Sequence, residues 1–147
     1  MGSHLYNSRL GKVAWFVRRF GASELFLKPL RCAFAPLIIP RLAKAEFVFE
    51  DKSLTLFYHR YNMTWANERA VEVPIAREFL ERYAGKRVLE VGNVTPNYLD
   101  TGHTVLDKYE RDLGIINEDI AEYSPTERFD LILSVSTFEH IGYDDEA

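Results

Sequence analysis

The pattern of apolar and polar positions divides the chain near residue 45. Over residues 5–20 apolar side chains recur at helical spacing, which predicts an amphipathic helix that ends near Gly21. Residues 24–44 mix apolar and basic side chains around three prolines. Because proline interrupts a helix, we expect short helices or extended pieces in that stretch.

Beyond this point the pattern changes to that of a β-hairpin. Residues 47–49 and 54–58 are rich in β-branched and aromatic side chains, and they flank a turn at residues 51–53. Runs of this composition on either side of polar turn residues are typical of two antiparallel strands. The sequence therefore predicts a hairpin over residues 46–60.

The following residues predict a helix and then a mostly parallel sheet. The helix is expected from Pro74 to Tyr83, because proline suits a first helical turn and Gly85 suits the position after the last one. Four short apolar runs then follow, and we interpret them as strands: residues 87–91, 104–106, 115–117 and 129–135. Strands that alternate with connecting segments indicate an α/β fold.

Composition narrows the class of protein. The chain has 147 residues, of which 47% are hydrophobic, so it has enough apolar side chains for a packed core. The one cysteine, Cys32, cannot form an internal disulfide, which suits a reducing, cytoplasmic location. The four histidines are scattered without the spacing of metal ligands, so no metal site is predicted.

Charge separates an N-terminal arm from the rest. Residues 1–45 contain eight basic residues and one acidic residue, whereas the whole chain has a net charge of −4. We therefore expect a basic amphipathic arm over 1–45 and a domain over 46–147. A membrane surface or acidic partner could contact residues 5–44, or the arm could be a helical cap with solvated charges. No run is long enough to span a membrane, and arginines interrupt every candidate signal peptide.

Residues 86–140 carry a series of motifs at the ends of the predicted strands. The first strand ends in Val88-Leu89-Glu90-Val91-Gly92, Asp107 follows the second strand, and Asn117-Glu118-Asp119 follows the third. The fourth strand leads to Phe138-Glu139-His140-Ile141. This series resembles the class I, Rossmann-like, S-adenosylmethionine-dependent methyltransferases. The resemblance implies a hairpin and helix cap over 46–85 and a Rossmann-like half-sheet over 86–147, an incomplete version of the fold.

The resemblance also assigns candidate binding residues. Glu90 and Gly92 would lie near the amino-acid end of the cofactor, and Asn93 would also contact the cofactor. Asp107 would accept hydrogen bonds from the ribose hydroxyls, and Asp119 would recognise the adenine amino group. Asp107 could instead pair with Lys108 or cap a turn, and Asp119 could belong to an ordinary polar loop.

Further candidates follow the fourth strand. Ser134 and Ser136 would face the cofactor, and Glu139 and His140 would be the catalytic residues, although the last two could equally cap the next helix. Thr95 before Pro96 indicates a helix N-cap whose backbone amides would face the cofactor.

The sequence departs from the family pattern in two respects. Of the usual alternating glycines only Gly92 is present, and the connection over residues 108–114 is too short for a crossover helix. The predicted function is methyl transfer from S-adenosylmethionine, with S-adenosylhomocysteine as product, to a small-molecule, glycan or lipid substrate. Two other readings stay open: a non-catalytic binding module attached through the arm, and a dinucleotide-binding domain. An exposed sheet edge would favour a homodimer, and nucleic acid is not expected as a partner.

Overall fold

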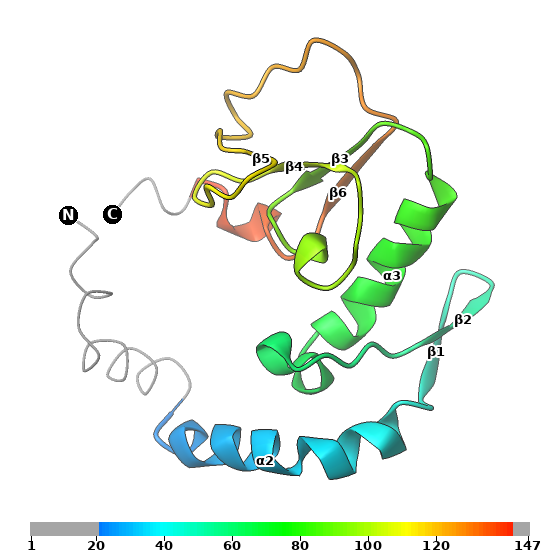
Figure 1. The fold of residues 1–147 in the computed structure, drawn as a ribbon, viewed down its shortest axis with the longest axis vertical. Coiled ribbons are helices and arrows are strands. Elements are labelled where there is room, and N and C mark those ends of the chain that lie inside the picture. The colour runs from blue at the N-terminus through cyan, green and yellow to red at the C-terminus, as the bar shows by residue number, and fades with distance from the viewer. Residues whose placement is uncertain (1–20, 143–147) are drawn as a thin grey trace. The chain divides into compact units, whose positions relative to one another are not determined.

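The computed structural model describes residues 21–142, which belong to two compact units (Figure 1). One unit contains the described residues 21–42 together with Gly142, and the other contains residues 43–141. The amphipathic helix expected over 5–20 lies outside the described residues.

Helix α2, Glu24–Leu42, replaces the short pieces expected for this stretch. Its three prolines, Pro29, Pro36 and Pro40, all lie inside the helix. They are seven and four residues apart, which is close to two turns and one turn, so they share one face. The missing hydrogen bonds therefore fall on one side, which bends a helix without ending it. Among the described residues, no helix is both long and apolar enough to cross a membrane.

The predicted hairpin forms, with a shorter loop and a shorter second strand. Strands β1, Glu46–Phe49, and β2, Lys52–Thr55, are antiparallel, and Phe49 pairs with Lys52. The loop therefore consists of only Glu50 and Asp51, and Glu50 has a φ of 52°. Two-residue hairpin loops need such left-handed residues, and glycine or asparagine is the usual signal for them. The loop contains neither glycine nor asparagine, which explains why the turn was predicted at residues 51–53 rather than at 50–51.

Helix α3, Arg69–Arg82, begins five residues before the predicted start, and Pro74 lies inside it. The 3₁₀ helix η1, Tyr61–Ala66, precedes it. Proline cannot donate to the carbonyl four residues back, which here belongs to Ala70. The amide of Phe57 donates to that carbonyl at 2.8 Å instead. The extended segment after β2 thus satisfies the acceptor that Pro74 leaves open, and the helix continues through the proline.

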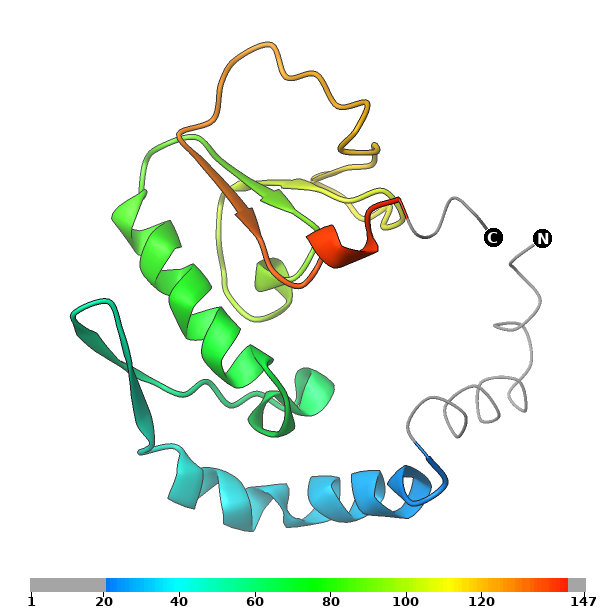
Figure 2. The same cartoon turned by 180° about the vertical axis from the view of Figure 1, so that it is seen from behind.

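The main sheet has four parallel strands in the order β5-β4-β3-β6. All four predicted strands are present, with slightly different ends: β3 is Val88–Val91, β4 is Thr104–Leu106, β5 is Ile115–Ile116 and β6 is Leu131–Ser134. The central strand β3 is buried along its whole length, because it has a partner on each side. This mixed α/β architecture is compatible with a Rossmann-like half-sheet, seen from both sides in Figures 1 and 2.

The connections between strands are short, and the core is correspondingly small. Leu89, Val91 and Leu106 form the buried cluster, and partly buried side chains from β5 and from the segment between β5 and β6 pack against it: Ile116, Ile120, Tyr123 and Phe129. Between β3 and β4 the only helical segment is the 3₁₀ turn η2, Thr95–Asn97, and β4 leads to β5 through a loop. The connection after the second strand was predicted to be too short for a crossover helix, and this prediction is confirmed.

Candidate functional site

The candidate site lies at the carboxyl ends of β3 and β6. Strands β4 and β5 lie on one side of β3, and β6 lies on the other. The connection after β3 therefore runs in one direction and the connection into β6 returns in the other, so the strand order reverses between β3 and β6. Open α/β sheets bind ligands at such a point, outside the carboxyl ends of the strands. Gly92 and Asn93 follow β3 there, and residues 135–137 follow β6. Helix α3 begins at this end as well, because Glu72 on its first turn contacts Ser136.

Glu90 is the buried centre of this region, with a fully buried side chain. Its Oε1 accepts the amide hydrogens of Val94 at 3.1 Å and Thr95 at 2.8 Å. Its Oε2 accepts the hydroxyl hydrogen of Thr95 and lies 2.6 Å from Nε2 of His103. The carboxylate therefore organises the loop after β3 from inside.

These contacts correct the expected helix cap. Thr95 lies within η2, is fully buried, and makes no capping hydrogen bond with its side chain. The amides of Asn97 and Tyr98, which would follow such a cap, donate instead to the carbonyls of Val94 and Thr95, and the amides of Val94 and Thr95 donate to Glu90. The reason is that an unpaired buried carboxylate is costly, and the nearest donors are these amides.

Gly92 is required at its position by conformation and by space. Its φ is +90°, and an added Cβ would lie 2.9 Å from both Cβ and Cγ2 of Thr137 and closer still to the hydroxyl. The space that a glycine opens beside the first strand is thus filled by a side chain from the loop after β6. The Thr137 hydroxyl donates to the carbonyl of Val135 at 3.1 Å.

Asp107 occupies the predicted strand-end position, and its carboxylate also caps the following turn. Oδ1 accepts from the amides of Tyr109 at 2.8 Å and Glu110 at 2.9 Å, and Oδ2 accepts from the amide of Asn93 at 3.1 Å. The last bond links the loops after β3 and β4. A carboxylate has about four acceptor sites, so roughly one remains for a ligand.

Asp119 lies after β5 and is tied to its own loop. One oxygen accepts from the amide of Ala121 at 2.9 Å, and the other pairs with Nζ of Lys108 at 2.9 Å. These two interactions, the backbone hydrogen bond first, lower the pKa of Asp119 despite an opposing effect of burial. Nearby, the Asn117 amide donates to the carbonyl of Asp107 at 2.9 Å, which holds the two strand ends together.

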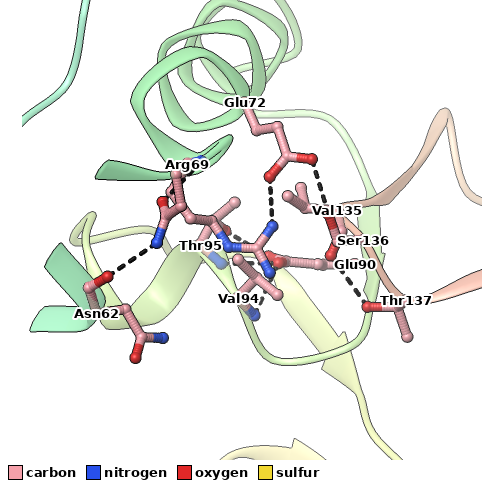
Figure 3. A network of polar contacts seen from close by, with 10 residues as sticks. Asn62, Arg69, Glu72, Glu90, Val94, Thr95, Val135, Ser136 and Thr137 are labelled. Atoms are coloured by element: carbon pink, nitrogen blue, oxygen red, sulfur yellow. Dashed lines mark hydrogen bonds and ion pairs between the residues drawn. The ribbon is translucent and has the colours of Figure 1, made fainter. Parts of the chain in front are cut away.

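Ser136 connects the loop after β6 to helix α3. Its hydroxyl donates to Glu72 at 2.7 Å, and Glu72 also pairs with Arg69 (Figure 3). Ser136 has a φ of 48°, a left-handed conformation that is uncommon for a residue with a side chain. Figure 3 shows this network beside Glu90 and Thr137, so the α3 side chains cover the carboxyl end of the sheet.

The predicted catalytic pair lies at the edge of this region. Glu139 and His140 belong to the 3₁₀ turn η3, Phe138–His140, and both are exposed. The backbone amide of His140 donates to the carbonyl of Thr137 at 2.9 Å, which closes the turn. The turn thus begins directly after the residue that packs on Gly92.

Two buried polar atoms at the carboxyl ends have no hydrogen-bond partner within residues 21–142: Asn93 Oδ1 and Ser134 Oγ. Buried polar atoms are normally satisfied, so two orphans at the point where such sheets bind ligands indicate a binding site. Asp107, with roughly one acceptor site left, would suit the nucleoside end of the expected cofactor. Beside Gly92, where the amino-acid end is expected, Thr137 occupies the space.

Sequence reasoning did not identify four residues that shape the site: Arg69, Glu72, His103 and Thr137. Arg69 and Glu72 lie three apart, a spacing typical of helical ion pairs, but the helix was predicted to begin after them. Contacts of His103 with Glu90 and of Thr137 with Gly92 join distant segments, and a single sequence carries no signal for such pairs.

Comparison with known protein families, with curated proteins and with solved structures finds no match to this chain. Within residues 21–142, no three histidine, cysteine, aspartate or glutamate side chains gather in a way that could hold a metal ion.

Proposed function

We propose that the carboxyl end of the sheet binds S-adenosylmethionine and that the protein is a methyltransferase. The observation that carries this proposal is the pair of unpartnered buried atoms, Asn93 Oδ1 and Ser134 Oγ, at the point where connections leave the sheet in opposite directions. Asp107 at the end of the adjacent strand supplies the acceptor expected for a ribose hydroxyl.

The residues of the chain would act mainly by position. Asp107 would accept one ribose hydroxyl with its remaining acceptor site, and Asp119 would lie near the adenine. Asn93 Oδ1 and Ser134 Oγ, which are buried and have no partner among the described residues, would contact the ligand once a movement of the loop after β6 exposes them. When bound, the cofactor supplies an electrophilic methyl group. Correct alignment of donor and acceptor contributes much of the rate of such transfers, and His140 or Glu139 would take the proton of the acceptor.

Thr137 decides whether the amino-acid end of the ligand can enter. Its side chain fills the space beside Gly92, so binding requires the residue to move or rotate. Ser136, which has a left-handed backbone and precedes Thr137, places this movement in the loop after β6. Strained backbone conformations of this kind are often found at ligand sites.

The test is calorimetric titration with S-adenosylhomocysteine, together with thermal unfolding. We expect saturable binding by the wild-type chain and binding about tenfold weaker by Asp107→Asn, which loses one acceptor oxygen. Asp112→Asn is the matched control, since Asp112 is exposed and lies before β5 rather than at the end of a strand. Equal affinities of Asp107→Asn and wild type would remove Asp107 from the site, and an absence of binding would reject the proposal.

A second function, a non-catalytic binding module, is favoured by the position of Thr137. If Thr137 fills the space beside Gly92 permanently, the protein would have the Rossmann-like half-sheet but would not bind the cofactor. Thr137→Ala distinguishes the two functions, because it removes the hydroxyl and the methyl group that crowd Gly92. Binding of S-adenosylhomocysteine by this variant alone would show that the wild-type residue blocks the site.

The expected partners and location stay predictions. Strand β6 pairs with β3 on one side, and Ile132 on β6 is 59% exposed, which is consistent with pairing to a second copy. The methyl acceptor would be a small molecule, a glycan or a lipid. A cytoplasmic location, with contact of the basic arm to a membrane surface, goes with these expectations.

A further inference from the structure

Helix α2 carries a row of large apolar side chains that are exposed to solvent. Five of them, between 41% and 73% exposed, form what we call the apolar stripe: Phe26, Leu27, Leu30, Phe34 and Leu37. Since each residue turns an α-helix by about 100°, these positions fall within about 100° of its circumference. Single exposed apolar side chains are common, whereas a continuous row of them is typical of a surface that contacts a partner.

The charge around the apolar stripe is positive. Residues 25–45 contain four basic residues and no acidic residue. Arg41 lies four residues after Leu37, so it follows the stripe by one helical turn, and both Arg41 and Lys44 are exposed. The Arg41 guanidinium donates to the carbonyl of Leu37 at 3.3 Å, which holds its charge beside the end of the stripe. The apolar stripe is therefore bordered by positive charge.

The rest of the chain has the opposite charge. Residues 1–45 contain eight basic residues and one acidic residue, yet the whole chain has a net charge of −4. The negative charge is thus concentrated in residues 46–147. A negatively charged surface attracts the segment that contains α2 and repels the remainder, so electrostatic forces favour an approach through α2.

An anionic lipid surface fits both properties of this helix. Helices that lie in a membrane surface bury phenylalanine and leucine among the acyl chains, and their arginines and lysines contact the headgroups. A second copy of the chain would instead bring the same positive charge against the stripe, which is unfavourable. We propose that α2 lies in the surface of an anionic membrane, with the apolar stripe among the acyl chains. This contact is independent of cofactor binding at the sheet.

Cosedimentation of the whole 147-residue chain with lipid vesicles tests the proposal. Vesicles of equal parts phosphatidylglycerol and phosphatidylcholine supply the anionic surface, and vesicles of phosphatidylcholine alone are the control. We expect binding to the anionic vesicles to be at least about tenfold stronger and to weaken as salt screens the charges. An absence of binding by folded protein, or equal binding to both kinds of vesicle, would overturn the proposal.

Leu30→Gln combined with Leu37→Gln tests the apolar stripe. Glutamine is also a good helix former, so the helix is kept, and we expect vesicle binding to fall at least about tenfold. Val48→Gln with Leu113→Gln is the matched control, because these residues are 76% and 105% exposed outside α2. Equal losses in the two double variants would reject the stripe as the contact. A dimer in size-exclusion chromatography that only the α2 substitutions dissociate would assign the stripe to a second copy instead.

Arg41→Gln combined with Lys44→Gln tests the charge beside the stripe. We expect binding to the anionic vesicles to weaken by about tenfold, with little change for neutral vesicles. Arg111→Gln with Arg128→Gln changes the net charge equally at exposed positions outside the arm, and it should bind as wild type does. Equal effects of the two pairs would mean that total charge determines binding, which would contradict the assigned face.

Discussion

At the carboxyl end of the parallel sheet, the candidate carboxylates have partners inside the protein, whereas at the amino end two buried atoms have none among the described residues. Asp107 accepts three backbone amides, and Glu90 accepts two amides and a hydroxyl. By contrast, the buried atoms Thr101 Oγ1 and His103 Nδ1, in the segment that leads into β4, have no hydrogen-bond partner among residues 21–142. Asn93 Oδ1 and Ser134 Oγ at the carboxyl end are buried and unpartnered among the described residues too. Unmet hydrogen-bonding capacity thus occurs at both ends of the sheet, whereas the resemblance to a known motif points to one.

Glu90 joins the two ends. One of its oxygens orders the loop that carries the candidate cofactor site, and the other lies 2.6 Å from Nε2 of His103, directly before β4. The motif residue is therefore a structural centre whatever the sheet binds. An acidic residue at the position of Glu90 is therefore weaker support for a bound cofactor than a carboxylate at a strand end that still has a free acceptor site.

The largest effect is expected for Glu90→Gln, which removes the charge shared by both ends. Breaking a buried pair from one side usually costs about 3–5 kcal/mol, because the other partner stays buried. The free energy of unfolding in urea measures this loss. Glu127→Gln, which removes a solvent-exposed ion pair with Arg87, is the control and should leave stability nearly unchanged. Similar losses in both variants would contradict the central role of Glu90.

Gly92→Ala should affect only the carboxyl end. Alanine at a φ of +90° costs about 1–2 kcal/mol by itself, and the clash with Thr137 should add about 1–3 kcal/mol. Gly114→Ala provides the matched control, because Gly114 also has a φ of +90° but open space around it. Urea unfolding of the two variants isolates the clash. Equal stability losses would mean that Thr137 does not fill the space beside Gly92.

Ser136→Ala should weaken the contact between the loop after β6 and helix α3. The variant loses a 2.7 Å hydrogen bond to Glu72, and we expect a loss of about 1–2 kcal/mol. Ser53→Ala removes a similar serine–glutamate bond to Glu46 in the exposed hairpin and should cost less. Chemical denaturation gives both values. A larger effect in the hairpin would show that the network in Figure 3 contributes little.

Asp119→Asn should give the smallest effect, and one that depends on pH. The folded-state pKa of Asp119 is lowered, so its ionised form stabilises the fold above the pKa of an unfolded aspartate. That contribution disappears as the pH falls through the lower folded-state pKa. Unfolding midpoints from neutral to acidic pH should therefore converge for wild type and variant. A difference that persists or grows at acidic pH would contradict the interactions with Ala121 and Lys108.

The sequence predicted the elements of the sheet well and the contacts between them poorly. Short apolar runs located all four strands, because buried parallel strands are apolar along their length. Helix α3 was predicted too short, since Pro74 is tolerated only because Phe57 bonds to the carbonyl that it leaves open. At the site, strand ends placed Asp107 correctly. The partners His103 and Thr137 arise from contacts between distant segments, which the pattern of one chain does not encode.

The most direct test of the proposed cofactor site is a titration with S-adenosylhomocysteine followed by amide chemical shifts. The proposal predicts saturable shifts at Gly92, Asn93, Asp107 and Ser134, with smaller changes at Thr101 and His103. Shifts confined to Thr101 and His103, or no shifts from a folded sample, would contradict cofactor binding at the carboxyl end of the sheet.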